Sequence, residues 1–523
     1  MKAACACLCL TVALGSATAD EVRAEPTPAD YEQAQKGLAA ARQQRCEDAV
    51  TILGSAADGD TFQGFPDKVR REVLDRLVYC AVELGMSGVA VPYLQQLTEM
   101  PGENARYRLR QLLWTAHRAG NAAVAADTLQ AIADSGPGEL DSMSVELVAR
   151  VYWEMARHSL NSDSRFRFLR VLYRAQYSPK NPFRSTDSLM VEFARMAADR
   201  GDMDTPKKII KNLTDPHSIF EIRVDRRFDE IRRDDHLERF LDLEAAANKQ
   251  IGDIASRVAR YPAVLEGHIA YSDALELVRR YQDALDAIEP IAQRLREPGG
   301  RDAFIDADRY ENWALERYSH ALARLDFDER ADAIHLESSQ LPKDAGGNVS
   351  QRINYASSQF AKGNHGDALR SIADVNIDNT SDYGSILIHQ IRICANAMGG
   401  FQRDYFDDLS YLIEKERKFG GVVLRAYLCL DQMDSAAQNL IRRLEHPDQR
   451  IGALMSLQNF ADEREDLDKL WLRYKPNSAT NLLDPGELLD LRFDMLRQRD
   501  DVLEAVDAVG RIEMVPLDSG RGT

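Results

Sequence analysis

Apolar and polar residues follow a helical period along almost the whole chain. Apolar positions recur at i, i+3, i+4 and i+7 in segments of about 12–15 residues, and short polar breaks separate these segments. Runs of alternating Val, Ile, Thr or Tyr bounded by hairpin turns, which would indicate strands, are almost absent. The pattern predicts an all-α protein made of antiparallel helix pairs.

Several of the polar breaks share one arrangement of small and large residues. Two of them match position by position at an offset of 35 residues: Gly85, Ala90 and Leu94, then Gly120, Ala125 and Leu129. The same order returns in Ala49, Leu53 and Ala56 after Gly37, in Tyr281, Ala284 and Ile288, and in Gly363, Ala368 and Ile372. A looser version has Gly201, Pro206 and Ile210.

This arrangement has a physical reading. A glycine ends one helix in the left-handed conformation. A small residue early in the next helix lets the two helices approach closely, and a large apolar residue four positions later fills the groove between them. Since one such pair cannot bury its apolar face alone, neighbouring pairs must stack.

On these residues, between position 30 and about 376, the chain resembles the tetratricopeptide-repeat family, whose unit is a helix–turn–helix of about 34 residues. The Trp that the family places near the start of a unit is missing from most segments. A different α-solenoid with irregular helix pairs therefore stays open as the competing fold. The resemblance implies an α-solenoid, a tetratricopeptide-like superhelix of stacked antiparallel helix pairs.

The repeats predict a division of the chain. Residues 216–262 start at the helix-stopping dipeptide Asp215-Pro216 and are strongly charged. The repeats beyond residue 376 are hard to align. The expected parts are a signal peptide at 1–19, a first helical array at 20–215, connecting helices at 216–262, a second array at 263–376 and degenerate hairpins at 377–523. The last nine residues, 515–523, are expected to fray.

The first residues have the composition of a secretory signal. Lys2 precedes an uncharged stretch from Ala3 to Gly15, and Ala17-Thr18-Ala19 has the small residues of a cleavage site. No cysteine stands at that site, and no later stretch approaches the ~20 apolar residues that span a bilayer. We expect cleavage near Ala19 and an exported protein, soluble in a Gram-negative periplasm.

Charge narrows the range of partners. The chain has 66 Lys and Arg against 84 Asp and Glu, a net charge of −18 at pH 7. An acidic surface disfavours non-specific binding to nucleic acids and anionic membranes. The expected partners are therefore proteins of the envelope and, as an alternative, a polysaccharide.

Four cysteines follow the predicted signal peptide. Cys46 and Cys80 are 34 residues apart, and Cys394 and Cys429 are 35 apart. An oxidising compartment permits disulfides, and we favour Cys46–Cys80 and Cys394–Cys429 because each would join neighbouring helices. Four buried free thiols remain the alternative.

Motifs that carry chemistry are missing from the sequence. None of the ten histidines has another within four residues, and neither HExxH nor a mature CxxC occurs. Neither GxSxG nor a phosphate-binding loop is present. We expect no catalytic residue, cofactor or metal, and each histidine is interpreted as a surface or packing residue.

One segment departs from the acidic composition. Residues 164–186 contain no acid, and aromatic residues stand between the basic ones. One interpretation is a site for an anionic group or acidic peptide, with the candidates Arg167, Arg170, Arg174, Tyr177, Lys180 and Arg184. The other is an ordinary helix with its aromatics in the core and its arginines paired with acids of neighbouring helices.

Three functions follow from these observations. The leading one is a non-catalytic scaffold for protein–protein interaction in the cell envelope, which the family resemblance implies at the level of the fold. The second is binding of an envelope polysaccharide by a polymer assembly or secretion system. The third is a helical-repeat envelope enzyme, which would need an isolated glutamate with a strongly raised pKa in a deep pocket.

Overall fold

The computed structural model describes residues 24–518, except 101–103, 137, 159–161, 342–347, 378–379, 402–404 and 475–482. The predicted signal peptide lies outside the described residues. Within them the chain folds into helices α1–α28, a few short 3-10 turns and two strands of two residues each. The contacts divide the chain into two compact units, residues 1–137 with 158–168, and residues 138–157 with 169–523.

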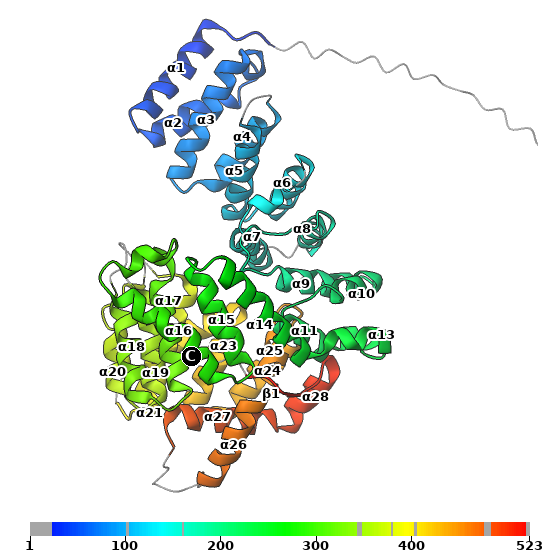
Figure 1. Cartoon of the computed structure of the whole chain (residues 1–523). Helices are drawn as coiled ribbons and strands as arrows, with labels where there is room; N and C mark the ends of the chain where they lie inside the picture. The colour runs from blue at the N-terminus through cyan, green and yellow to red at the C-terminus, as the bar shows by residue number, and fades with distance from the viewer. Residues whose placement is uncertain are drawn as a thin grey trace, which may run out of the picture. The chain divides into compact units, whose positions relative to one another are not determined.

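The first unit is a stack of three helix pairs. They are α1 (Pro28–Arg42) with α2 (Cys46–Ala57), α3 (Asp67–Glu83) with α4 (Ser87–Glu99), and α5 (Ala105–Arg118) with α6 (Ala122–Asp134). Each helix contacts the next, and α1 also contacts α3, as expected when the first helices of successive pairs pack together (Figure 1).

The second unit contains most of the remaining helices, and α8 is divided between the units. Its first elements are α7 (Val145–His158), α8 (Ser162–Arg174), α9 (Asp187–Ala198), α10 (Asp204–Ile210), α11 (Pro216–Val224), α12 (Asp229–Arg232), α13 (Asp235–Glu238) and α14 (Leu243–Arg260). The central pairs are α15 (Leu265–Leu277) with α16 (Tyr281–Arg296), α17 (Ala307–Ala323) with α18 (Asp328–Gln340), and α19 (Val349–Ala361) with α20 (His365–Ile372).

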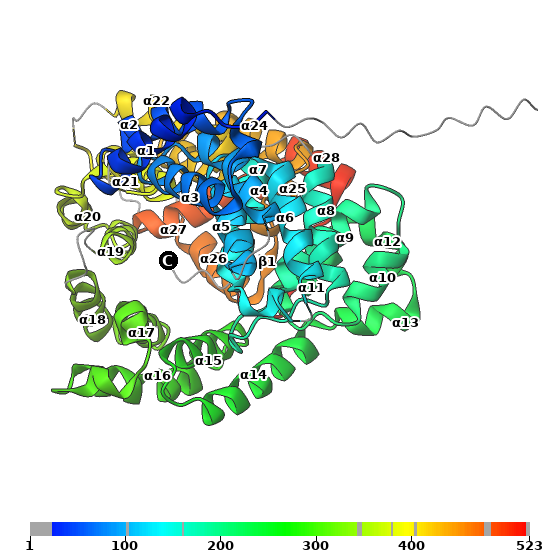
Figure 2. The same ribbon diagram turned by 90° about the horizontal axis from the view of Figure 1, so that it is seen from above.

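The last part of the second unit continues with α21 (Asp382–Met398), α22 (Phe406–Glu414), α23 (Glu416–Cys429), α24 (Met433–Glu445), α25 (Arg450–Ser456), β1 (Asn459–Phe460), α26 (Ala461–Arg473), α27 (Pro485–Arg497), α28 (Asp500–Val509) and β2 (Met514–Val515). The pairs α15/α16, α17/α18 and α19/α20 follow one another along an arc, with α15, α17 and α19 on its inner side (Figure 2). Each of these first helices contacts the next, and α19 continues the series to α21 and α23.

The predicted small and large positions follow one register in the structure. Eight of the helix pairs in the described residues share one register, and each of these turns through a residue with positive φ: Gln44, Gly85, Gly120, Gly201, Arg279, Asp326, Gly363 and Asp431. Five positions later stands a buried small residue or proline: Ala49, Ala90, Ala125, Pro206, Ala284, Ala331, Ala368 and Ala436. A left-handed residue closes the first helix, and the small residue permits close packing in the second.

Gly37 was predicted to end a helix at a turn, and the structure corrects this prediction. It lies inside α1, and a Cβ there would come within 2.4 Å of the Leu53 side chain. Gly37 therefore serves close packing of α1 on α2, and Gln44, with φ of 59°, makes the turn that the sequence had attributed to glycine.

The expectation of a frayed tail is wrong for residues 515–518. Val515 and Leu517 are buried, and β2 pairs in parallel with β1. The backbone N–H of Asp518 donates to the carbonyl oxygen of Leu277 at 2.8 Å. The segment is ordered because its apolar side chains and its backbone polar groups both find partners inside the second unit.

The predicted domain boundaries at 215, 262 and 376 remain a prediction. They do not coincide with the division between the two compact units. The described structure divides near residues 137 and 168 instead. One reason is that the segment after Asp215 does more than connect two arrays. Arg223 pairs with Glu513 at 2.9 Å, and an isolated bridge joins Asp225 to Gly510, so the last residues of the second unit bind this segment.

Both cysteine pairs are joined as disulfides. Cys46 at the start of α2 is bonded to Cys80 of α3, with a Cα–Cα distance of 4.8 Å. Cys394 of α21 is bonded to Cys429 of α23, with a Cα–Cα distance of 5.1 Å. Each bond links helices of adjacent repeats rather than the two helices of one pair.

Candidate functional site

The arginine-rich segment starts as a packed helix. Phe168 and Leu169 of α8 are fully buried. Arg167 forms an ion pair with Asp127 of α6 at 2.7 Å, and Arg170 is half-buried and has an interaction partner. The apolar side of α8 therefore faces the core, while its first arginines are held by neighbouring groups.

Two candidates further along bind other parts of the second unit. Tyr177 is buried, its hydroxyl donates to the carbonyl oxygen of Met143 at 2.9 Å, and burial raises its pKa. Arg184 contacts three side chains of the helices α7, α15 and α17: Glu146, Glu266 and Tyr310. Both side chains fix the loop between α8 and α9 to its surroundings.

Arg174 and Lys180 are exposed and form no ion pair within the described residues, whereas the exposed Arg167 and Arg184 do. Arg174 lines a cavity of about 500 Å³ beside Leu172, Met190 and Ile209. The structure thus separates the six candidates into structural contacts and two basic groups on the surface, instead of gathering them into one site.

A longer recess follows the inner helices of the second unit. One cavity of about 600 Å³ is lined mainly by α15 and α17, and another of about 670 Å³ is lined by α19, α21, α23 and the start of α25. Asn354 of α19 lines both cavities. We call the combined surface the inner groove, lined among others by Ile269, Asp273, Trp313, Glu316, Asn354, Ser357, Tyr383, Gln390, Arg425 and Arg443.

The inner groove combines exposed rings with amide groups. Trp313 retains 38% of its surface and Tyr383 retains 56%. Asn354 and Gln390 add side-chain amides to the lining of the groove. Aromatic faces and amides together suit a ligand that has both apolar side chains and a polar backbone.

Arg443 of α24 is an unusual cation in this groove. Burial lowers its pKa to about 10, and its Nη1 has no hydrogen-bond partner within the described part of the chain. Gly420 and Gly421 of α23 leave room for it, since a Cβ at Gly420 would come within 2.8 Å of the Arg443 Cδ. A buried guanidinium without a carboxylate is costly, and an anionic ligand would relieve that cost.

A cluster of charges lies at the floor of the first cavity. Arg317 of α17 pairs with Asp273 of α15 and, at 2.9 Å, with Glu276. Glu276 is buried, and burial raises its pKa even though Arg317 opposes that shift. Glu316, the residue before Arg317, adds a third carboxyl group to the same surroundings.

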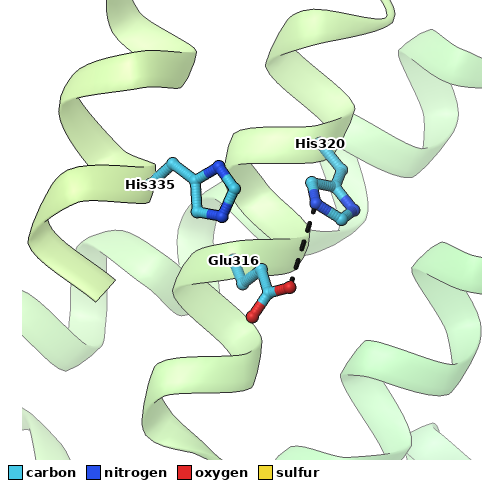
Figure 3. A group of neighbouring side chains, drawn as sticks. All are labelled: Glu316, His320 and His335. Carbon is cyan, nitrogen blue, oxygen red and sulfur yellow. Dashed lines mark ion pairs between the residues drawn. The ribbon is translucent and has the colours of Figure 1, made fainter. Parts of the chain in front are cut away.

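Glu316 lies beside two histidines. It is 4% exposed, and its Oε1 accepts a hydrogen bond from the Nδ2 of Asn354 at 2.6 Å. Burial raises the pKa of Glu316 to about 7. His320 stands one turn later on α17, with its Nε2 4.0 Å from Glu316 Oε1, and His335 reaches toward both from α18 (Figure 3).

Both imidazoles are held in their neutral form. Burial lowers the pKa of His335 to about 4. Burial also lowers the pKa of His320 well below its usual value, and the nearby Arg317 lowers it further. The site therefore brings two neutral imidazoles next to one carboxyl group, a set that can bind a metal ion or exchange a proton.

The spacing of histidines along the chain does not reveal this group, because no two of them are close together in the sequence. His320 and His335 are 15 positions apart, and the turn at Asp326 brings them to a ring-centroid distance of 5.8 Å. Glu316 also has the raised pKa that was set as the mark of a catalytic glutamate. It lines a cavity, so the enzyme hypothesis gains one candidate residue.

No helix within the described ranges has the length and apolar character needed to cross a membrane.

Comparison with known proteins adds likeness to two solved structures. No family model and no curated protein matches the chain. The tetratricopeptide domain of P58(IPK) is 12% identical, with a TM-score of 0.17, over 72% of this chain and 100% of that one. A circular tandem repeat protein with a novel repeat topology is 14% identical, with a TM-score of 0.12, over 92% and 96%.

Neither likeness assigns a function to this chain. The helix pairs themselves, with their left-handed turns and buried small residues, establish the construction. The protein is an all-α solenoid of stacked antiparallel helix pairs.

Proposed function

We propose that this protein is a non-catalytic scaffold of the cell envelope that binds an extended polypeptide segment of a partner protein in its inner groove. The observation that carries the proposal is the continuity of two cavities along the first helices of successive repeats, joined at Asn354. A row of helices with equivalent faces offers the same kinds of side chain at regular intervals, which suits a chain in extended conformation.

Arg443 supports a partner segment with an anionic group. Its guanidinium lines the groove, is largely buried and lacks a carboxylate partner among the described residues. A partner's acidic side chain or terminal carboxylate would form a charge-assisted pair with it. Since the guanidinium is already desolvated and positioned by Gly420, little further ordering is needed on binding.

The envelope location is part of the proposal. It is supported by the signal-like residues 1–19 and by the pairing of Cys46 with Cys80 and Cys394 with Cys429, since disulfides persist in oxidising compartments. Arg174 and Lys180 are proposed as additional contacts for an acidic partner, since both are exposed and neither forms an ion pair within the described residues.

A sugar polymer is the second candidate ligand. The exposed faces of Trp313 and Tyr383 are the specific observation in its favour, because sugar rings stack on aromatic side chains. Arg443 separates the two candidates: a neutral polymer does not need its charge, and a polypeptide carboxylate does.

A photocrosslinker placed in the groove tests the proposal. A benzophenone amino acid at position 313 is expected to capture one partner segment in intact cells, identified by mass spectrometry. The matched control is position 336, where Leu336 has the same 38% exposure and lines neither cavity of the inner groove. Equal capture at both positions, or none at 313, would overturn the groove as the binding surface.

The Arg443→Met variant adds a second, opposite readout. Replacing a buried unpaired cation with an apolar side chain of similar length is expected to raise the thermal midpoint. The same change is expected to abolish crosslinking at position 313. Retained crosslinking to a polypeptide would remove Arg443 from the proposal, and retained binding to a glycan would favour the polymer.

A further inference from the structure

We propose that Glu316, His320 and His335 form a binding site for a divalent transition-metal ion of the zinc class, built into the α17/α18 helix pair. This inference is independent of the groove's ligand and stands even if no partner segment binds there.

The three side chains already converge. Each offers one ligand atom, and these atoms lie within 4.8 Å of one another. Bonds of about 2.0–2.2 Å to an ion require ligand atoms roughly 3.3 Å apart. Rotation of the imidazole rings about their side-chain torsions supplies that contraction without moving the helices.

Most of the polar atoms of the three side chains have no hydrogen-bond partner within the described residues. Both ring nitrogens of His320, the Nε2 of His335 and the Oε2 of Glu316 are buried without a hydrogen-bond partner. Buried polar atoms in native proteins are nearly always satisfied, so four of them around one point indicate a missing ligand. Asn354 holds the remaining Glu316 oxygen, as an outer-shell partner orients a metal-binding carboxylate.

The repeat register shows that His335 replaces an apolar residue. Nine positions after the turn residue, the other seven pairs have a buried leucine or isoleucine: Leu53, Leu94, Leu129, Ile210, Ile288, Ile372 and Leu440. In the α17/α18 pair this position is His335. Ten positions before the turn the residue type varies: the pairs on either side have Ile269 and Ile353, this pair has Glu316, and α3 and α5 have Asp75 and Arg110.

Packing alone does not explain this replacement. A leucine or isoleucine at 335, like the buried Ile288 and Ile372 of the neighbouring repeats, would have no polar atom to desolvate. His335 of α18 instead faces Glu316 and His320 of α17 (Figure 3). A ligand-binding role accounts for the buried imidazole at this position.

The surrounding charge suits a cation of charge +2. Asp273, Glu276 and Glu316 surround a single guanidinium, that of Arg317. Arg324, which acts on His320, pairs with Asp518 at 3.0 Å and lies 3.8 Å from Asp462. Lys362, which acts on His335, pairs with Asp332 at 2.7 Å. With Glu316 ionised, the cluster around Arg317 has more negative than positive charge, which a divalent ion balances.

The donor set selects the kind of ion. Two imidazoles and one carboxylate favour zinc and its transition-metal neighbours over calcium and magnesium, which prefer oxygen ligands. Three protein ligands leave one coordination position for water or a group of a partner. Glu316 and His320 line the first cavity of the inner groove, so that position has a route to the groove.

The test uses the untagged full chain, stripped with a chelator and titrated with Zn²⁺ alone against a chromophoric competitor. We expect one ion per chain, a rise in thermal midpoint on addition of Zn²⁺, and a visible absorption band of tetrahedral type with Co²⁺. Failure to take up either ion, or uptake with an octahedral Co²⁺ spectrum, would overturn the proposal.

Two variants place the site. His335→Leu restores the residue type of the other repeats, so the apo protein is expected to fold with equal or greater stability while metal affinity falls by at least about 100-fold. Glu316→Gln keeps the Asn354 contact and is expected to weaken binding by ~10–100-fold. His365→Gln, at a half-buried histidine of α20, is the matched control and leaves affinity unchanged. If only His365→Gln reduced uptake, the ion would lie elsewhere.

Discussion

Arg511 and Asp229 form an ion pair across 282 positions of the sequence. The contact joins the segment after α28 to α12. The guanidinium of Arg511 also donates to the carbonyl oxygen of Arg223, and the carboxylate of Glu513 pairs with Arg223 at 2.9 Å and with Arg232 at 3.0 Å. The end of the second unit is thus bound to helices that precede its central repeats.

Gly510 sits at this junction, and its substitution tests the contact. A Cβ at Gly510 would come within 2.6 Å of the carbonyl oxygen of Val224 and of the Leu454 side chain. Gly510→Ala is expected to lower the free energy of unfolding by about 1–3 kcal/mol, because overpacking shifts the backbone. Urea denaturation followed by circular dichroism measures the change.

The control for that substitution is a glycine in open space. Gly252 lies inside α14, and a Cβ there meets no atom within 4 Å. Gly252→Ala is expected to raise the free energy of unfolding by about 0.5–1 kcal/mol through helix propensity. If Gly510→Ala were as harmless as this control, the junction would not contribute to stability.

Arg195 is a buried ion-pair residue of α9. It is 5% exposed, pairs with Glu192 at 2.7 Å and also pairs with Glu221 of α11. Arg195→Ala is expected to destabilise the second unit by about 3–5 kcal/mol, because two carboxylates lose their buried counter-ion. Arg42→Ala, which breaks an exposed pair with Glu72, should cost less than about 1 kcal/mol by the same denaturation measurement.

Asp518 makes stability depend on pH. Burial raises the pKa of its carboxyl group to about 7, and a hydrogen bond that the protonated carboxyl group donates to Asp462 contributes. A carboxyl group whose pKa is higher in the folded than in the unfolded protein stabilises the fold below pH ~4, and this contribution is lost as pH rises through about 7.

Asp518→Asn removes that proton-binding difference. Tyr281 and Arg324 each donate to a different oxygen of Asp518 at 3.0 Å. The oxygen of an asparagine can still accept from Arg324, and its amide N–H can donate to the Tyr281 hydroxyl. The variant is expected to gain stability relative to the wild type as pH rises from 4.5 to 7.5, measured as the difference between their thermal midpoints. A constant difference over that range would show that the carboxyl group at 518 is ionised throughout.

The disulfides are expected to contribute to stability. Cys46–Cys80 and Cys394–Cys429 close loops of 34 and 35 residues. The chain-entropy estimate for loops of this size is roughly 3–4 kcal/mol each. A Cys46→Ala/Cys80→Ala variant should therefore unfold at lower urea concentration than the wild type, with the unit containing α1–α6 affected first.

Thiol labelling of the unreduced protein gives the direct check on that pairing. The four cysteines should resist alkylation until a reductant is added, and peptide mapping should recover the two linked pairs. Full labelling of the protein after unfolding without reductant would instead favour the alternative of four free thiols that are buried in the folded state.

The sequence by itself determined the secondary structure and the repeat architecture. Ala90 and Leu94, or Ala125 and Leu129, are spaced by the helical period, and the glycines before them mark where one helix must end. These are local preferences of the backbone and of helix packing, so they can be read without knowing which repeats touch. The turn at Gln44 keeps the same register, although its left-handed residue is not a glycine and the glycine pattern therefore does not predict it.

The tertiary structure decided which side chains share a site. By its sequence Arg184 could bind a ligand, but the fold places Glu146 and Glu266 beside it. The sequence also does not show that Arg443 Nη1 is buried without a hydrogen-bond partner among the described residues. Glu316 and His320 of α17 meet His335 of α18 only because these two helices pack together. The same packing buries Glu316 and His335. Desolvation and convergence depend on distances between helices, and those distances are fixed by packing rather than by position in the chain.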